Sequence, residues 1–271
     1  MNRFLMCALA AGAIVPVAHG TADALLFNQD VTSNAIFGSG NANGSFTVDR
    51  SSGVELGLRA KVRFPEAQNV FNSNGDGTYN HAAGNDAGRP LWAFEWSINS
   101  NYDGSSGYEI GDLTYEIGMD FDPTAGTSYF AFDHITPGAQ PWWDHSFGDN
   151  LTGQGQGTEA TDASSYTGLL FGSNLVQNSW RMDFFDSPVS PFSFDPNSDG
   201  TYSFYLKAFE EGGGGEFVPN LLAYTEIQVI VGDGVPEVPE PSSLAILGIG
   251  LLAAGTATWR NRRRGQGKAA A

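Results

Sequence analysis

The sequence predicts an all-β fold, an antiparallel β-sandwich of jelly-roll type, on three observations. Apolar and polar residues alternate along several segments of the body, which is the pattern of strands that bury one face. Segments rich in Gly, Asn, Asp and Ser separate these runs and are typical of turns. The body shows neither a long helical period nor an alternation of strands with helices, which favours antiparallel over parallel pairing.

The clearest predicted strand covers residues 53–64, where every second side chain from Val54 to Phe64 is apolar. The charged side chains between them, such as Glu55 and Arg59, are expected to lie on a second face that meets water. Further strands are predicted at residues 91–99, 113–121, 128–135, 179–185, 201–209 and 222–231.

Two connecting segments have predicted structures of their own. Residues 160–175 are expected to hold one short helix, with Asp162 or Ser164 as its N-cap. Residues 210–217, EEGGGGEF, are predicted to form a hairpin loop, because the strand-like run that follows comes too soon for a second domain. Residues 25–232 therefore form one β-sandwich domain in this prediction.

The N-terminal segment, residues 1–24, is predicted to be a secretory signal peptide. It has one cation, then an apolar run, then small residues, which is the usual order of such signals. Cleavage is expected after Ala24, with a cut after Gly20 as the alternative; a buried N-terminal helix is the competing interpretation. Cys7 is the only cysteine and lies inside this segment, so the mature body can form no disulfide.

The C-terminal segment is predicted to enter a membrane. A proline-rich linker at residues 233–243 is expected to be extended, and an apolar helix follows at residues 244–259. Those sixteen residues span roughly 24 Å, which is short of a hydrocarbon core of about 30 Å. The basic tail at residues 260–271 is expected to stay in the cytoplasm. Its membrane-stop residues are Arg260, Arg262, Arg263 and Arg264.

Three features in this order, Pro239-Glu240-Pro241, an apolar helix and an arginine cluster, resemble the PEP-CTERM sorting signal. The resemblance implies export through the secretion translocon, transient anchoring in the membrane, and recognition of the three motif residues by an exosortase, a membrane cysteine peptidase. It further implies removal of the tail near the motif and delivery to the cell surface or to an exopolysaccharide matrix. The closing GQGKAAA runs slightly past the usual ending of such a signal.

The body is strongly acidic. Between Leu25 and Ser243 the chain has 29 Asp and Glu residues against seven Arg and Lys, a net charge of −22. Such a body repels phosphate backbones, so nucleic acid is excluded as a partner.

One acidic loop resembles the first half of a calcium-binding loop. Asp195, Asn197 and Asp199 alternate and are followed by a glycine, as calcium ligands do in a tight turn. The twelfth position is Leu206, where an EF-hand requires a glutamate. Both a calcium site and a plain turn before a strand fit this pattern, and the loop that starts at Asn72 is a weaker copy.

A second candidate is the segment Trp142-Trp143-Asp144, because aromatic faces beside polar groups suit sugar rings. Burial of both tryptophans in the core is the alternative. His134 and His145 each follow an aspartate and would suit a transition metal if the fold brings them together. A third histidine, His81, is expected to be solvated.

The sequence contains no enzyme signature, so no catalytic residue is assigned and a non-enzymatic protein is predicted. The function that fits best is a structural or adhesive role in an exopolysaccharide layer. A secreted glycan hydrolase that uses two carboxylates, with Glu95 and Glu116 as candidates, is one alternative. A surface-binding protein that keeps its helix as a permanent anchor is the other.

Overall fold

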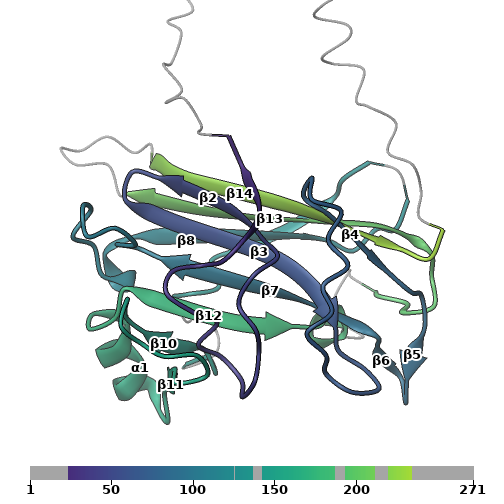
Figure 1. The fold of residues 1–271 in the computed structure, drawn as a ribbon, viewed down its shortest axis with the longest axis horizontal. Helices are drawn as coiled ribbons and strands as arrows, with labels where there is room; N and C mark the ends of the chain where they lie inside the picture. The colour runs from purple at the N-terminus through teal and green to yellow at the C-terminus, as the bar shows by residue number, and fades with distance from the viewer. Residues whose placement is uncertain (1–23, 125, 137–141, 187–192, 211–218, 234–271) are drawn as a thin grey trace, which may run out of the picture.

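A computed structural model describes residues 24–124, 126–136, 142–186, 193–210 and 219–233. These residues are mostly β-structure. Among them the larger sheet has seven strands, in the order β1-β2-β3-β7-β12-β10-β11 (Figure 1). Their bounds are Leu26–Gln29 (β1), Phe46–Ser51 (β2), Val54–Val62 (β3), Trp92–Asn99 (β7), Leu175–Trp180 (β12), Ser146–Gly148 (β10) and Thr158–Glu159 (β11).

The smaller sheet has five strands within the described ranges, in the order β4-β14-β13-β8-β9. Every strand pair in the two sheets is antiparallel except β4 with β14, which run parallel. The bounds are Thr78–His81 (β4), Asn220–Val231 (β14), Gly200–Glu210 (β13), Thr114–Asp120 (β8) and Tyr129–Phe132 (β9). A separate two-stranded ribbon is formed by β5 (Asn85–Asp86) and β6 (Arg89–Pro90).

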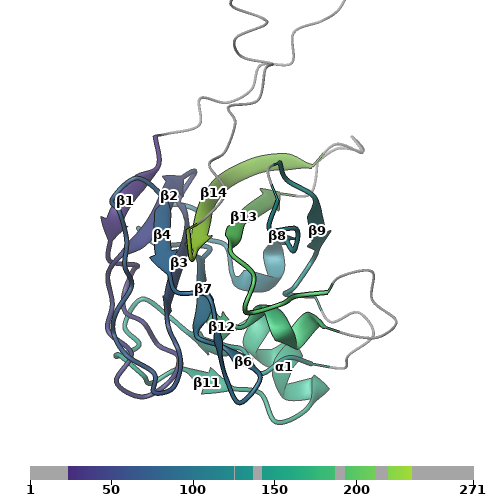
Figure 2. The same cartoon turned by 90° about the vertical axis from the view of Figure 1, so that its right-hand side faces the viewer.

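The two sheets form two layers around one apolar core, as Figure 2 shows from the end of the strands. Phe94 of β7 stacks on Phe204 of β13 with ring centroids 4.4 Å apart, and Trp92 meets the same ring edge-on at 6.2 Å. These contacts join the inner faces of the two layers, which is the arrangement of a β-sandwich. The predicted all-β antiparallel character is confirmed, and the jelly-roll subtype stays a prediction.

Most strands lie where alternation predicts them. β13 and β14 pair antiparallel, as the predicted hairpin loop at residues 210–217 requires. The strand predicted at residues 179–185 is wrong. There β12 ends at Trp180, and a 3-10 turn, η2 (Met182–Phe185), follows; a second such turn is η1 (Ile110–Asp112). Met182 and Phe184 would lie on the same face of a strand, yet Met182 is buried in the core and Phe184 is exposed. A turn allows this difference.

The predicted short helix is confirmed as α1 (Ala163–Leu170). Asp162 is its N-cap, because its carboxylate accepts a hydrogen bond of 2.8 Å from the Ser165 amide. Tyr166 on this helix packs edge-on against Phe147 of β10, with centroids 5.3 Å apart. The helix therefore covers the larger sheet at the edge where its shortest strands lie (Figure 1).

The outer face of β3 is not wet, so that part of the strand prediction is wrong. Glu55 and Arg59 are 0% exposed, and Lys61 is 6% exposed. The covering segment is residues 30–45, between β1 and β2, which we call the N-terminal strap. It is fixed to the larger sheet through Gln177 of β12, whose side-chain amide accepts a bond from the Ile36 amide at 2.7 Å and donates to the Asn34 carbonyl at 2.8 Å.

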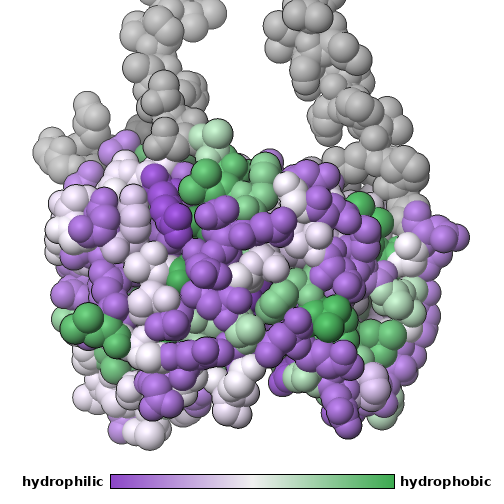
Figure 3. Space-filling model, viewed as in Figure 1, coloured by the Kyte–Doolittle hydropathy of each residue, from purple (hydrophilic) through white to green (hydrophobic). Residues whose placement is uncertain are grey.

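The surface seen in Figure 3 is mostly hydrophilic, with apolar residues in small separate groups. One such group lies at the top of the view. Leu26 and Phe27 of β1 are among the exposed apolar side chains of the described chain.

Several sequence predictions concern residues outside the described ranges. They are the signal peptide up to residue 23, the linker from residue 234, the apolar helix at residues 244–259 and the basic tail. Within the described part of the chain, no helix combines the length and the apolar character needed to span a membrane.

Candidate functional site

Three tyrosines form a row across the outer face of the smaller sheet. Tyr205 of β13 lies in the middle, with the Tyr129 ring of β9 at 4.7 Å and the Tyr224 ring of β14 at 6.2 Å between centroids. We call this surface, defined by Tyr129, Tyr205 and Tyr224, the tyrosine face. Alternation explains it, because the side chains between these positions, such as Phe204, point into the core.

A glycine on the neighbouring strand makes room for the central tyrosine. A Cβ atom added at Gly118 of β8 would lie 2.1 Å from Cε1 and 2.3 Å from Cζ of the Tyr205 ring. The ring therefore lies flat across the backbone of β8, where any other residue would lift it off the sheet. This position fixes the orientation of the aromatic surface.

Charged side chains hold the tyrosine hydroxyls. Tyr205 donates a hydrogen bond of 2.7 Å to Glu116 Oε1, and Lys207 donates one of 2.8 Å to the same oxygen. The Lys207 ammonium also lies 4.1 Å from the centroid of the Tyr205 ring. Tyr224 donates in the same way to Glu226 Oε2. The hydroxyl protons of Tyr205 and Tyr224 are thus directed at carboxylates.

The electrostatic consequences follow from these bonds. Burial and the hydrogen bond to Glu116 raise the pKa of Tyr205, and burial and the bond to Glu226 raise the pKa of Tyr224. For Glu116, burial acts to raise the pKa, but the bonds from Lys207 and Tyr205 outweigh it and lower the pKa. At neutral pH the face therefore presents neutral Tyr205 and Tyr224 rings and a charged Glu116 carboxylate.

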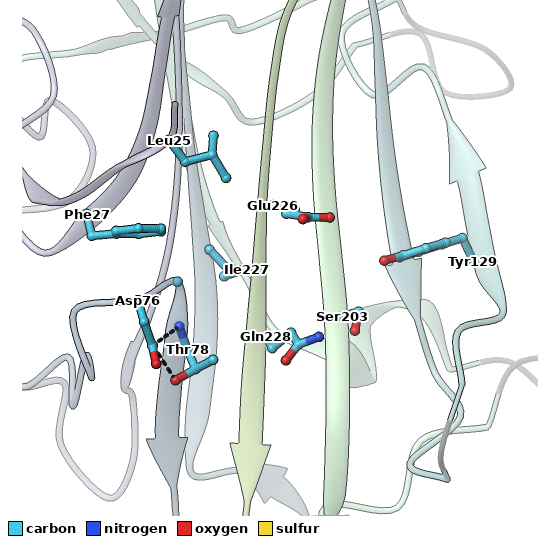
Figure 4. Close-up of a pocket in the computed structure, with 10 residues that line it drawn as sticks. Leu25, Phe27, Asp76, Thr78, Tyr129, Ser203, Glu226, Ile227 and Gln228 are labelled. Carbon is cyan, nitrogen blue, oxygen red and sulfur yellow. Dashed lines mark hydrogen bonds between the residues drawn. The ribbon is translucent and has the colours of Figure 1, made fainter. Parts of the chain in front are cut away.

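A pocket of about 270 Å³ lies beside the tyrosine row on the same face of the sheet. Figure 4 shows side chains from five segments around it, with Phe27 on one side and Tyr129 on the other. Between them, Glu226 and Gln228 project from β14 and Ser203 from β13. The remaining lining residues are Leu25, Asp76, Gly77, Thr78 and Ile227.

The walls of the pocket are held locally. The Phe27 ring lies close over Gly77, where an added Cβ would be 3.2 Å from Cε1. Asp76 Oδ1 accepts bonds from the Thr78 amide at 3.0 Å and from the Thr78 hydroxyl at 2.7 Å, so this carboxylate is held at the rim. Those two bonds lower the pKa of Asp76 and keep it charged. Ser203 is 3% exposed, and its buried hydroxyl has no partner among the described residues.

The calcium candidate forms a compact turn. Asp195 Oδ1 accepts bonds from the amide of Asn197 at 2.9 Å and from its side chain at 3.0 Å. The Asp199 carboxylate packs against Gly232, where an added Cβ would be 1.9 Å from Oδ1. Within the described ranges, no three His, Cys, Asp or Glu side chains gather as metal ligands would. The arrangement is that of a turn, and calcium binding stays a prediction.

The Trp142-Trp143-Asp144 segment packs largely against the core. Both tryptophans are half-buried and contact the core cluster, whereas Asp144 is exposed. The Trp143 ring stacks on His145 at 6.0 Å with 7° between the planes. One face of the Trp143 indole is thus already covered by His145. Sugar contact at this segment stays a prediction.

The fold does bring His134 and His145 together, with ring centroids 6.4 Å apart. Both lie at 0% exposure beside Trp96, whose ring is 4.6 Å from one and 4.9 Å from the other. Tyr166 donates its hydroxyl proton to the Ile135 carbonyl, so it must accept from His145 Nδ1. His145 is thereby held as the neutral Nδ1–H tautomer.

Two other sequence predictions are corrected by the structure. His81 is not solvated, since it is 6% exposed and stacks on Trp92 at 6.1 Å. Glu95 and Glu116 are not brought together as a hydrolytic pair would require. Glu95 is bonded to Arg59 on the outer face of the larger sheet, and Glu116 lies on the outer face of the smaller one, so the core separates them.

The tyrosine face was missed by sequence reasoning. Its signal lies in the polar positions of two predicted strands: Ser203, Tyr205 and Lys207 in one, Glu226 and Gln228 in the other. Alternation places these side chains on outward faces, but it does not show that the two strands are neighbours.

These features define a two-layered β-protein with an aromatic, carboxylate-bearing outer face and a shallow pocket. Residues 237–264 match the family model of the PEP-CTERM protein-sorting motif. The chain therefore carries this sorting signal at its C-terminus, as its Pro-Glu-Pro sequence indicates, and the signal implies an exported protein that is sorted by an exosortase. No curated protein and no solved structure matches the chain.

Proposed function

We propose that the body is a non-catalytic glycan-contacting module that holds the exported protein in an exopolysaccharide layer, in a structural or adhesive role. The tyrosine face is the observation that carries this proposal. It combines the exposed ring of Tyr129 and the half-buried ring of Tyr224 with hydroxyl, amide and carboxylate groups on one side of the sheet. Sugar rings have an apolar face and a polar rim, and surfaces of this composition complement both.

The sorting signal supports the same function. An exosortase substrate leaves the cytoplasm and is delivered to the cell surface or outside it, which brings it to the site of an exopolysaccharide layer. We propose that the apolar helix anchors the protein only transiently and that the tail is removed near Pro239-Glu240-Pro241. The larger sheet offers less open surface for contact, because the N-terminal strap covers the outer face of β3 and β12.

A hydrolase would need two carboxylates about 5 to 10 Å apart across a cleft. On the tyrosine face, Glu116 and Glu226 lie on the two strands that flank β13, opposite Lys207 and Tyr205 respectively. Two strand spacings and the offset of two residues put their backbones roughly 12 Å apart. Both carboxylates are also bonded within the face, Glu116 by Tyr205 and Lys207 and Glu226 by Tyr224, and this supports binding over hydrolysis.

The test is co-sedimentation of the processed protein with the extracellular polysaccharide of its own host. Tyr129→Ala and Tyr224→Ala variants are expected to lower the retained fraction several-fold. The matched control is Phe184→Ala, which removes an aromatic ring that is 56% exposed on η2, outside the tyrosine face. Equal retention of all three variants would refute the proposal. Repeating the assay with calcium and with a chelator tests whether the Asp195 loop contributes.

A further inference from the structure

The pocket on the tyrosine face is negatively charged. Asp76 and Glu226 both line it, and none of its lining residues among the described part of the chain is Lys, Arg or His. The nearest cation of the tyrosine face, Lys207, is bonded to Glu116 and lies against the Tyr205 ring. The lining side chains thus include two carboxylates and no cation, and cleavage after Ala24 would add a single positive charge, the new α-ammonium of Leu25.

The two carboxylates keep one oxygen each for a ligand. Asp76 uses Oδ1 for both of its bonds to Thr78, which leaves Oδ2 at the exposed rim. Glu226 uses Oε2 for the Tyr224 hydroxyl, which leaves Oε1 on the side chain that projects beside Gln228 (Figure 4). Both remaining oxygens are acceptors only, so a ligand group that contacts them has to donate a hydrogen bond.

The floor of the pocket adds an independent observation. Ser203 is buried, lines the pocket and has a hydroxyl without a partner in the described chain. An unpaired buried hydroxyl costs free energy, and a bonded ligand group would remove that cost. Next to it, the Gln228 side chain supplies a further donor and acceptor, while Phe27 and Tyr129 supply aromatic walls.

We infer that this pocket binds a sugar without negative charge: a neutral, hydroxyl-rich residue or an amino sugar of the polysaccharide, and not a uronic acid. The inference rests on the proposed function and specifies the class of glycan. Hydroxyl or ammonium groups of the sugar donate to Asp76 and Glu226. A sugar carboxylate would instead be repelled by both and could donate no hydrogen bond to their free oxygens.

The test measures binding of the processed protein to three soluble oligosaccharides of equal length by calorimetry. They are a neutral glucose oligomer, a glucosamine oligomer and a uronic acid oligomer. At low salt we expect the glucosamine oligomer to bind at least as tightly as the neutral one, and the uronic acid oligomer to bind at least tenfold more weakly. Raising the salt to 0.5 M should narrow these differences, because salt screens exposed charges.

The variant Glu226→Gln keeps the shape of the side chain and removes its charge. It should reduce the preference for the glucosamine oligomer several-fold and should bring the uronic acid oligomer closer to the neutral one. The control Glu159→Gln makes the same change on β11, an exposed strand of the other sheet, and should leave all three affinities unchanged.

Tightest binding of the uronic acid oligomer, or the same preference in Glu226→Gln as in the parent, would overturn the inference and leave the proposed function standing. Absence of binding to all three oligomers would also overturn it. In that case, retention in the co-sedimentation assay shows whether the proposed function fails as well.

Discussion

Arg59 and Glu95 form an ion pair in which neither side chain is exposed to solvent. The guanidinium Nε lies 2.6 Å from Glu95 Oε2, and its Nη1 donates to the carbonyls of Ala42 and Gly44 in the N-terminal strap at 2.9 and 2.6 Å. Lys61 lies 3.2 Å from the other carboxylate oxygen. Burial is tolerated because the charges and donors find partners.

Removal of the negative charge should therefore be costly. Glu95→Gln leaves two buried cations without a counter-charge, and the free energy of unfolding should fall by about 3 to 5 kcal/mol. The control is Glu116→Gln, which breaks a partly exposed pair with Lys207 and should cost no more than about 1 kcal/mol. Urea unfolding of both variants checks this, and similar losses in the two would contradict it.

A methyl group at Gly118 should disturb the tyrosine face. Gly118→Ala forces Tyr205 off the sheet, and overpacking of this kind costs about 1 to 3 kcal/mol. The matched control is Gly168→Ala in α1, where an added Cβ meets nothing within 4 Å. That change should stabilise the protein by about 0.4 to 1 kcal/mol, because alanine favours the helix. The thermal unfolding midpoint should thus fall for Gly118→Ala and rise for Gly168→Ala.

Stability should fall as the solution becomes acidic. Burial lowers the pKa of His81 to about 4 and of His145 to about 3, and burial, with His145 as neighbour, lowers that of His134 well below its usual value. Unfolding frees each imidazole to take a proton near pH 6.5, so the stability is present above that pH and is lost as the pH falls toward 4. The maximum slope is about 1.4 kcal/mol per pH unit for each histidine.

Urea titrations between pH 7.5 and 4.5 measure this slope. His145→Gln should reduce it by about a third, since one of the three buried imidazoles is removed. Burial raises the pKa of Glu55. Its contribution to stability therefore has the opposite sign and increases as the pH falls through that raised pKa. The difference between variant and parent isolates the histidine, and an unchanged slope would argue against its neutral buried state.

Processing of the tail can be read from the mature C-terminus. Replacement of Pro239, Glu240 and Pro241 by alanine should abolish recognition by the exosortase, so the protein should keep its arginine cluster and stay with the membrane. Mass spectrometry of the parent should show a C-terminus near the motif. An intact tail on the parent protein would favour the permanently anchored alternative.

Local patterns predicted the strands because a half-buried strand must alternate, whatever its partners are. The same patterns could not show that the outer face of β3 is covered and buried. Whether Arg59 meets water depends on the strap, which is joined to β12 by contacts between residues more than a hundred positions apart. Alternation records the two faces of a strand and contains no information about what covers them.

The candidate site has the same limit. Tyr129 and Tyr205 meet only because β9 and β13 both pair with β8, and strand order across a sheet is not written in any single segment. The Pro-Glu-Pro signal, by contrast, is contiguous in the sequence, so it could be recognised from the sequence alone.

The strap also imposes an order of events on export. Residues 30–45 are among the first of the body to emerge, yet Ile36 bonds to Gln177 and Gly157, and Ser33 to Thr152. Until those late residues have crossed, the leading segment has no place to dock and the first strands lack their cover. The earliest part of the body to cross the membrane thus cannot complete its folding until residues 152–177 have followed it.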